Sequence, residues 1–196
     1  MPNLTLRCTV IVGSVREGRF GPTAARWFAR TAAEPGRFEV DVIDLGDHPL
    51  LALPGPVAKP TAEVAAALAE VTPRLAAADV FVVVTPEYNH SFPAALKSLI
   101  DWHFEQWQAK PVGYVSYGGR SGGLRAVEHL RQVFSELHAV SVRDTVSFHG
   151  GSSVFTDDGE PRDGAGARAA AKGMLDQLEW WGTALREARE KRPYLG

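Results

Sequence analysis

The sequence predicts an α/β, three-layer, doubly wound fold, in which a parallel five-stranded sheet has the strand order 2-1-3-4-5. The central strand is expected at Val80–Val84, because a short, unbroken apolar run suits burial on both faces of a sheet. Four more strand-like runs alternate with helical stretches, which implies parallel pairing and right-handed crossovers. A chain of 196 residues, 45% of them hydrophobic, can bury such a core as one domain spanning 1–196.

The first strand is expected at Leu4–Val12, and a loop of small, hydroxylated and basic residues follows it. Pro22 stands where the first turn of a helix tolerates a proline, so a helix is expected to begin there. Phe38–Val42 alternates apolar and acidic residues, as a half-covered strand does, and is therefore placed at an edge of the sheet.

The segment between the second and third strands holds an irregular part and a helix. Residues 46–60 contain four prolines and are expected to form an excursion over the surface. Residues 61–78 are rich in alanine and helical in composition, although Pro73 is expected to bend or shorten the helix. After the central strand, Pro93 is expected to open a further helix over 94–107.

The second half of the chain repeats the alternation. A fourth strand is expected at Val112–Tyr117, and the glycine-rich segment 118–123 leads from it into a helix with apolar residues at helical spacing. Val140–Phe148 is expected to be the fifth strand, and 155–164 a turn-rich loop. The closing helix is expected to bury one stripe, which consists of Met174, Leu178, Trp181 and Leu185.

The overall charge and hydropathy exclude several classes of protein. A formal net charge of -2 and a pI of about 6.3 argue against nucleic acid as the main partner, since phosphate neutralisation requires a surplus of basic residues. No stretch reaches the roughly 18 apolar residues of a membrane helix, and the first residues lack the pattern of a signal peptide. The lone Cys8 is expected to be a small buried hydrophobe, which fits a reducing cytoplasm.

The histidines and tryptophans suggest packing more than chemistry. No metal-binding spacing is present, so no metal is expected, and the histidines are interpreted as surface or helix-face residues: His90, His103, His129, His138 and His149. Four tryptophans are too many for helix surfaces alone. Core packing is expected to take some of them and an oligomer interface the rest: Trp102, Trp107, Trp180 and Trp181.

Three loops are expected to form one crevice, because they leave the carboxyl ends of strands one, three and four, which are neighbours in the expected order. The first loop carries Arg16 and Arg19 and runs into a helix N-terminus, where free amides favour a phosphate. The second offers Tyr88 and Asn89, and the third offers glycines with exposed amides. A planar ring system attached to a phosphate would use all three loops.

The first two loops also have a structural interpretation. The first lacks the GxGxxG and Walker spacings and could be a solvated turn. Glu87 could be a general base, but a carboxylate that caps a turn or meets solvent is the more common case. Tyr88 could stack on a ligand or pack the turn, and the spacing leaves both open.

The three loops together resemble those of the NAD(P)H-dependent FMN reductase family, which has a flavodoxin-like fold. The resemblance spans nearly the whole chain, and its most specific part is Pro86-Glu87-Tyr88-Asn89 with Ser91 and Pro93 downstream. The weaker motifs are Gly13-Ser14-x-Arg16 and Ser116-Tyr117-Gly118 followed by Gly122-Gly123. By this resemblance, the cofactor-binding residues would be Ser14, Arg16, Arg19, Phe20, Gly21, Pro86, Glu87, Tyr88, Asn89, Ser116, Gly118, Gly119 and Gly122.

The resemblance implies an FMN enzyme that takes hydride from NADPH or NADH and passes electrons to a quinone, flavin, azo dye or similar acceptor. The flavin carries this chemistry, so no catalytic side chain is named. Many members carry Ser and Asn where this chain has Arg19 and Gly21, so a guanidinium would replace hydroxyl and amide contacts to the phosphate. A homodimer or homotetramer is implied. The alternatives are a flavodoxin-like electron carrier and a non-catalytic regulatory domain, but a carrier is typically strongly acidic.

Overall fold

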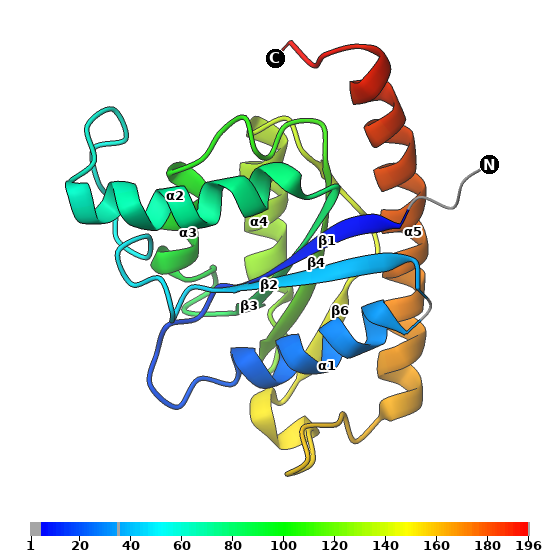
Figure 1. The fold of residues 1–196 in the computed structure, drawn as a ribbon. Coiled ribbons are helices and arrows are strands. Elements are labelled where there is room, and N and C mark those ends of the chain that lie inside the picture. The colour runs from blue at the N-terminus through cyan, green and yellow to red at the C-terminus, as the bar shows by residue number, and fades with distance from the viewer. Residues whose placement is uncertain (1–4, 35, 196) are drawn as a thin grey trace.

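A computed structural model describes residues 5–34 and 36–195, so the expected strand residue Leu4 lies outside the described part. The sheet has the order β2-β1-β3-β4-β5, and every pairing in it is parallel. This is the predicted order, with the predicted central strand at its middle (Figure 1). The four long strands are β1 (Leu6–Val12), β2 (Phe38–Asp44), β3 (Val80–Pro86) and β4 (Pro111–Gly118).

The predicted fifth strand is interrupted, and this part of the prediction is wrong. It forms β5 (Val140–Ser141) and β6 (Val146–His149), which pair with the first and the second half of β4. Between them, the guanidinium of Arg131 donates to the carbonyls of Val142 and Arg143 at 2.8 and 2.9 Å. The side chain of Gln177 accepts from the amide of Asp144 at 3.1 Å. Side chains of two helices thus bind the backbone of the segment that separates the two short strands.

Helices cover both faces of the sheet, as a three-layer fold requires (Figure 1). One face is covered by α1 (Gly21–Ala33) and α5 (Gly164–Lys191). The other is covered by α2 (Ala62–Ala77), α3 (Ala94–Asp101) and α4 (Leu124–Glu136). A short 3-10 helix, η1 (Gly151–Val154), follows β6.

The side chains of the central strand alternate between the two layers of core. Val82 and Val84 pack with α1 and α5, and Phe81 and Val83 pack with α2, α3 and α4. All four are fully buried, as predicted for a strand covered on both faces. Cys8 is also buried, and burial raises the pKa of its thiol to about 12, which confirms that it is a buried hydrophobe.

Three helical predictions need correction. Pro73 lies inside α2 and does not shorten it, since the helix continues to Ala77, and the alternative expectation of a bend at Pro73 stays a prediction. The helix after Pro93 ends at Asp101 and not at residue 107, and turns follow it. In α5 the predicted stripe is wrong at Trp181, which is 38% exposed. Gly182 faces the sheet instead, since a Cβ there would lie 2.6 Å from a methyl of Val80.

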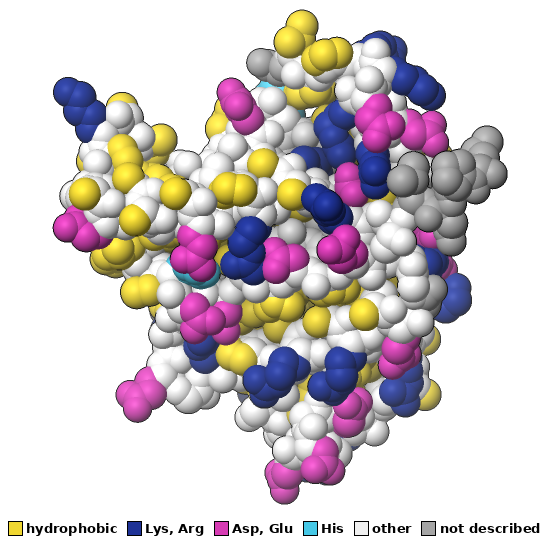
Figure 2. Space-filling model, in the orientation of Figure 1, with side chains coloured by type: hydrophobic (Ala, Val, Ile, Leu, Met, Phe, Trp, Pro, Cys, Tyr) yellow, Lys and Arg dark blue, Asp and Glu magenta, His cyan; other side chains and the backbone are white. Residues whose placement is uncertain are grey.

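The excursion at 46–60 has turns and no strand or helix, as predicted. It leaves Leu53 and Val57 61% and 58% exposed, and hydrophobic side chains gather over α2 and the adjoining excursion in Figure 2. Its carbonyl at Leu53 accepts a hydrogen bond from the indole of Trp102 at 3.0 Å. Trp102 and Trp107 are core residues, whereas Trp180 is 65% exposed, so core packing explains only part of the tryptophan set.

One histidine is also misassigned by the sequence. His103 is buried, and its ring lies 2.9 Å from the carbonyl of Leu99 and 3.0 Å from the hydroxyl of Thr72. Within the described residues, no helix combines the length and the apolar character needed to cross a bilayer.

Candidate functional site

The three loops meet at the carboxyl ends of three neighbouring strands. They are called here the β1 loop (13–20), the β3 loop (87–93) and the β4 loop (119–123), after the strands that they follow. Because β3 lies between β1 and β4 in a parallel sheet, all three loops leave the same edge. Contacts between each pair of loops or strand ends define the site.

The β1 loop is tied to the end of β4 through Tyr117. The Tyr117 hydroxyl donates to Ser14 Oγ at 3.1 Å, and both residues are buried. Burial raises the pKa of Tyr117 to about 12, so this hydroxyl keeps its proton at physiological pH. Gly21 begins α1 against this pair, since a Cβ there would lie 3.0 Å from the Tyr117 hydroxyl and closer still to Ser14. Only glycine fits this position without displacing the pair.

The β1 loop meets the β3 loop through a stacked pair. The guanidinium of Arg16 lies 3.6 Å from the centre of the Tyr88 ring, a cation–π contact between two partly solvent-exposed side chains. Tyr88 is itself fixed by two backbone hydrogen bonds to Ser91, at 2.8 and 3.1 Å. Asn89 and His90 turn the chain between them in the left-handed region, with φ of 48° and 76°. The structure therefore gives Tyr88 a partner from another loop.

The β3 and β4 loops are joined by Glu87, whose side chain is only 6% exposed. Its carboxylate accepts from the Ser121 hydroxyl at 2.6 Å and from the Arg125 amide at 3.2 Å, and it pairs with the Arg125 guanidinium at 2.6 Å. Burial opposes ionisation, but the bonds from Ser121 and Arg125 and the charge of Arg125 outweigh it and lower the pKa of Glu87. This environment suits a fixed anion that holds two loops together and not a base near neutral pH.

The β4 loop depends on glycines at its end. Gly122 and Gly123 have φ of 59° and 86°, and a Cβ at Gly123 would lie 2.7 Å from Ser116. The Ser116 hydroxyl is buried and donates to the carbonyl of Gly122 at 2.8 Å. Gly119 differs, because nothing lies within 4 Å of the position that a Cβ would take. Gly119 thus borders an open side of the loop, whereas a Cβ at Gly118 would lie 3.1 Å from the Gly123 amide nitrogen.

Arg19, Phe20 and Pro86 are used within the protein. The Arg19 guanidinium forms an ion pair with Asp44 at the end of β2 and donates to the carbonyl of Ser14 at 3.0 Å. Phe20 packs its ring edge-on against Tyr117, with centroids 5.1 Å apart, and Pro86 is buried. Arg19 therefore fastens the β1 loop to the edge strand, and Arg16 is the cation of this loop without a carboxylate partner in the described residues.

The residues present fit a phosphorylated flavin. Within the described part of the chain, the amides of Val15 to Gly18 have no protein acceptor, and these residues are exposed. Free amides beside the guanidinium of Arg16 and ahead of the α1 N-terminus are a suitable environment for a phosphate. An aromatic ring at Tyr88 and the open side of Gly119 suit the approach of a flat ring.

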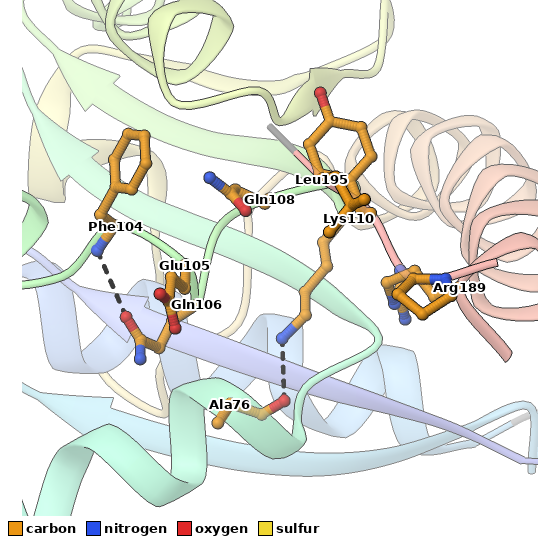
Figure 3. A pocket seen from close by; sticks show the side chains of 10 residues that line it. Ala76, Phe104, Glu105, Gln106, Gln108, Lys110, Arg189 and Leu195 are labelled. Carbon is orange, nitrogen blue, oxygen red and sulfur yellow. Dashed lines mark hydrogen bonds between the residues drawn. The ribbon is translucent and has the colours of Figure 1, made fainter.

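A separate cavity of about 670 Å³ lies at the opposite end of the sheet, beside the start of β4 and the end of α5 (Figure 3). Its buried cation, Lys110, donates to the last carbonyls of α2, at Leu75 and Ala76, at 3.0 and 2.9 Å. Burial lowers the pKa of Lys110 to about 8. Arg189, at its rim, pairs with Asp79 and donates to the carbonyl of Ala109. These cations stabilise the C-terminal end of α2 and its junction with β3.

Sequence reasoning missed Ser121 and Arg125 as members of the site. Arg125 did carry a signal, because an arginine in the first turn of a helix faces the positive end of the helix dipole and needs a compensating anion. Ser147 and His149, which contact the β4 loop from β6, carried no signal in the local pattern. Their placement depends on how β6 pairs with β4.

Comparison with known proteins yields consistent matches. A family profile described as NADPH-dependent FMN reductase matches residues 6–153. The chain is 38% identical over 124 residues to an NAD(P)H-dependent FMN reductase of Schizosaccharomyces pombe, a match that covers 61% of this chain and 62% of that protein. It is 34% identical over 188 residues to a quinone reductase of Escherichia coli, covering 93% and 94% of the two chains.

A solved structure shares the fold. The flavoenzyme FerB, an NAD(P)H:(acceptor) oxidoreductase of Paracoccus denitrificans, superposes with a TM-score of 0.71. The match covers 92% of this chain and 98% of that one at 22% identity. At that identity the likeness concerns the fold, and it agrees with the sheet order described above.

Proposed function

This chain belongs to the NADPH-dependent FMN reductase family, and on that premise we propose that it holds FMN where the β1, β3 and β4 loops meet. The observation that carries the proposal is the convergence of Arg16 on Tyr88 and of Glu87 on the β4 loop. These contacts bring together, at one edge of the sheet, a phosphate-binding loop, an aromatic ring and an open glycine. That edge is where ligands bind in open α/β sheets.

Each loop has its own part in binding. The amides of Val15 to Gly18 and the guanidinium of Arg16 would hold the phosphate. Asn89, exposed at the tip of the β3 loop, would contact the ring or the ribityl chain beside Tyr88. Gly118 and Gly119 would border the ring. Arg19, Phe20, Gly21 and Ser116 would act indirectly, because they shape the loops from within.

The reaction divides between cofactor and protein. FMN, when bound, would supply the redox chemistry, which is the uptake of a hydride from a nicotinamide and the delivery of two electrons to a second substrate. The protein would keep the loops rigid, leave one face of the ring open to both substrates, and direct backbone amides at the ring edge where negative charge develops on reduction. The lowered pKa of Glu87 keeps this side chain ionised and bonded to Ser121 throughout. No side chain of the site is assigned a proton transfer.

We propose NADPH or NADH as the donor and a quinone as the leading acceptor. The support is that a relative aligned over 93% of this chain is named a quinone reductase. A quinone is flat and can lie on the exposed face of the ring, as a nicotinamide does. Free flavins and azo dyes are also flat, and we propose them as further electron acceptors.

The test is an absorption spectrum of the purified protein reconstituted with FMN, taken without oxygen before and after NADPH is added. The expected result is a bound flavin spectrum that bleaches on addition of NADPH without a separate reductase and returns on addition of benzoquinone. A flavin that binds but is reduced only through a separate reductase would indicate an electron carrier. A protein that binds no flavin would contradict the proposal and favour a regulatory domain.

We also propose that residues 1–196 form one domain that assembles as a homodimer or homotetramer in the cytoplasm. The exposed apolar side chains of the excursion and of α5 support association, and the free thiol of Cys8 suits a reducing compartment. Light scattering at micromolar concentration would test the assembly, with a monomer as the contrary result. A single cooperative unfolding transition of the isolated chain would test the domain.

A further inference from the structure

The backbone of the β4 loop is held from behind by the end of β6. The amide of Gly150 donates to the carbonyls of Gly118 and Gly119, at 2.9 and 3.0 Å. Nδ1 of His149 lies 3.1 Å from the carbonyl oxygen of Arg120. A carbonyl can only accept, so Nδ1 must carry the hydrogen of this bond. The three successive carbonyls of Gly118, Gly119 and Arg120 are thereby fixed toward β6.

A second side chain from β6 completes this support. The hydroxyl of Ser147 donates to the carbonyl of Gly122 at 3.0 Å, and the same carbonyl accepts from Ser116. Ser147 Oγ also lies 3.2 Å from Nε2 of His149, so the two side chains contact each other. A Cβ at Gly122 would lie 2.6 Å from the His149 ring, which shows how closely the ring is packed against the loop.

The direction of the carbonyls determines the direction of the amides. In a trans peptide the C=O of one residue and the N–H of the next point in opposite directions. The carbonyls of residues 118 to 120 face β6, so the amides of Gly119, Arg120 and Ser121 face away from it. β6 pairs with one edge of β4 and β3 with the other, so this direction is toward the β3 loop.

The three amides are available to a ligand. In residues 5–34 and 36–195, no backbone or side-chain acceptor is assigned to the amides of Gly119, Arg120 or Ser121. The loop is stabilised through its carbonyls and presents its donors to the crevice beside Glu87. Such fixed donors stabilise developing negative charge without reorganising during the reaction.

We infer that Ser147 and His149 are positioning residues, which hold the amides of Gly119, Arg120 and Ser121 toward the electron-rich edge of the reduced flavin. This inference rests on the proposed function, because the flavin is the group that the amides would face. Neither side chain would need to contact the ring. Their effect is transmitted through the carbonyls of Arg120 and Gly122.

Two substitutions of the same residue separate this role from simple packing. In His149→Asn the amide nitrogen can stand where Nδ1 stands, and the bond to the carbonyl of Arg120 is kept. In His149→Gln the amide nitrogen stands where Nε2 stands, and that bond is lost. Ser147→Ala removes the bond to Gly122. His138→Gln, at the opposite end of the sheet, is the control for the loss of a histidine.

The first measurement is the affinity of the full-length variants for oxidised and reduced FMN. A hydrogen bond of this kind changes an equilibrium about two- to tenfold. We expect His149→Gln and Ser147→Ala to lose up to about tenfold more affinity for reduced than for oxidised FMN. A tenfold loss corresponds to a midpoint potential about 30 mV more negative for a two-electron couple. His149→Asn and the control should match the wild type, and equal loss for both redox forms in all variants would overturn the inference.

The second measurement needs no flavin. Backbone NMR order parameters of the flavin-free chain should fall at residues 119–121 in His149→Gln and stay at wild-type values in His149→Asn. Unchanged order parameters in His149→Gln would refute the support by β6 even if FMN binds. If the chain bound no FMN but the order parameters changed as expected, the proposed function would fail and the support of the loop would stand.

Discussion

Replacing Glu87 with Gln tests whether this carboxylate is a base or a link between two loops. The substitution keeps the size of the side chain and one carbonyl-type acceptor, but it removes the negative charge. In the structure this charge faces the Ser121 hydroxyl at 2.6 Å and the Arg125 guanidinium at 2.6 Å. The change therefore weakens contacts between the β3 and β4 loops without opening a cavity.

The expected loss of stability follows from these contacts. A hydrogen bond to a charged group contributes about 1.5 to 3 kcal/mol and a neutral one about 0.5 to 1.5 kcal/mol, so weakening the Ser121 bond costs about 1 kcal/mol. Arg125 is 48% exposed, so solvent screens its ion pair, and its loss costs about 0.2 to 1 kcal/mol more. With the weaker bond to the Arg125 amide included, the free energy of unfolding should fall by about 1.5 to 3 kcal/mol.

The assay combines urea unfolding with stopped-flow reduction of the FMN-loaded protein by NADPH. Glu87→Gln should unfold at lower urea, while the rate of flavin reduction at saturating NADPH should stay within about threefold of wild type. Loss of a general base lowers a rate by about 10² to 10⁴-fold. A loss of that size with unchanged stability would refute the structural role of Glu87.

The pH dependence of stability provides an independent check on the same residue. The pKa of Glu87 is lower in the folded protein than in the unfolded chain, so its contribution is present above the unfolded value of about 4.3. That contribution is lost as the pH falls through the folded pKa. The difference in unfolding free energy between wild type and Glu87→Gln should therefore shrink on acidification. A difference that stays constant down to pH 3 would contradict this reasoning.

Four further substitutions test other parts of the structure. Arg16→Ala should weaken FMN binding about ten- to a hundredfold in fluorescence titrations, because it removes a charge-assisted contact to the phosphate. The free energy of unfolding should change little. Unchanged FMN binding would place the phosphate elsewhere. Gly21→Ala should destabilise the fold by about 1 to 3 kcal/mol in urea unfolding, because the new Cβ would meet Ser14 and Tyr117. Gly119→Ala should unfold like the wild type and bind FMN less tightly. The pKa of Lys110 is about 8 in the folded protein and about 10.4 in the unfolded chain, so the unfolded state binds more protons between these two pH values. The contribution of Lys110 to stability therefore rises with pH over this range, by about 3 kcal/mol. Lys110→Met should lack this rise in urea unfolding measured at pH 7.5, 9 and 10.5, and an equal rise in the variant would show that other groups cause it.

The order of the fold could be predicted because its signals are local. The apolar run at Val80–Val84 identified a strand covered on both faces, and the prolines at 22 and 93 marked two helix starts. The break in the fifth strand could not be predicted, because it depends on Arg131 and Gln177, which reach it from two helices. The orientation of α5 depends on how closely Gly182 approaches Val80, a contact that helical periodicity does not contain.

The candidate site was predictable in its location but not in its internal contacts. Strand ends that are neighbours in a parallel sheet bring their loops together, so the meeting of the three loops followed from the sheet order. The partners of individual residues did not. Arg19 is paired with Asp44, 25 positions away, and Glu87 is bonded to Arg125, 38 positions away. The role of a loop residue therefore depends on partners that are distant in the sequence, and residue type and loop position alone do not identify these partners.

The interruption between β5 and β6 also affects how the sheet ends. A long edge strand presents unpaired amides and carbonyls that can template pairing with another chain, and this is a common start of aggregation. Here one margin consists of two short strands of two and four residues, whose intervening carbonyls are occupied by Arg131. The other margin, β2, carries Asp41 in an ion pair with Arg74. The interrupted margin thus offers little continuous backbone to a second molecule, and at β2 the Arg74 guanidinium also donates to the carbonyl of Val42 at 2.7 Å. Both features hinder strand-to-strand polymerisation at high concentration.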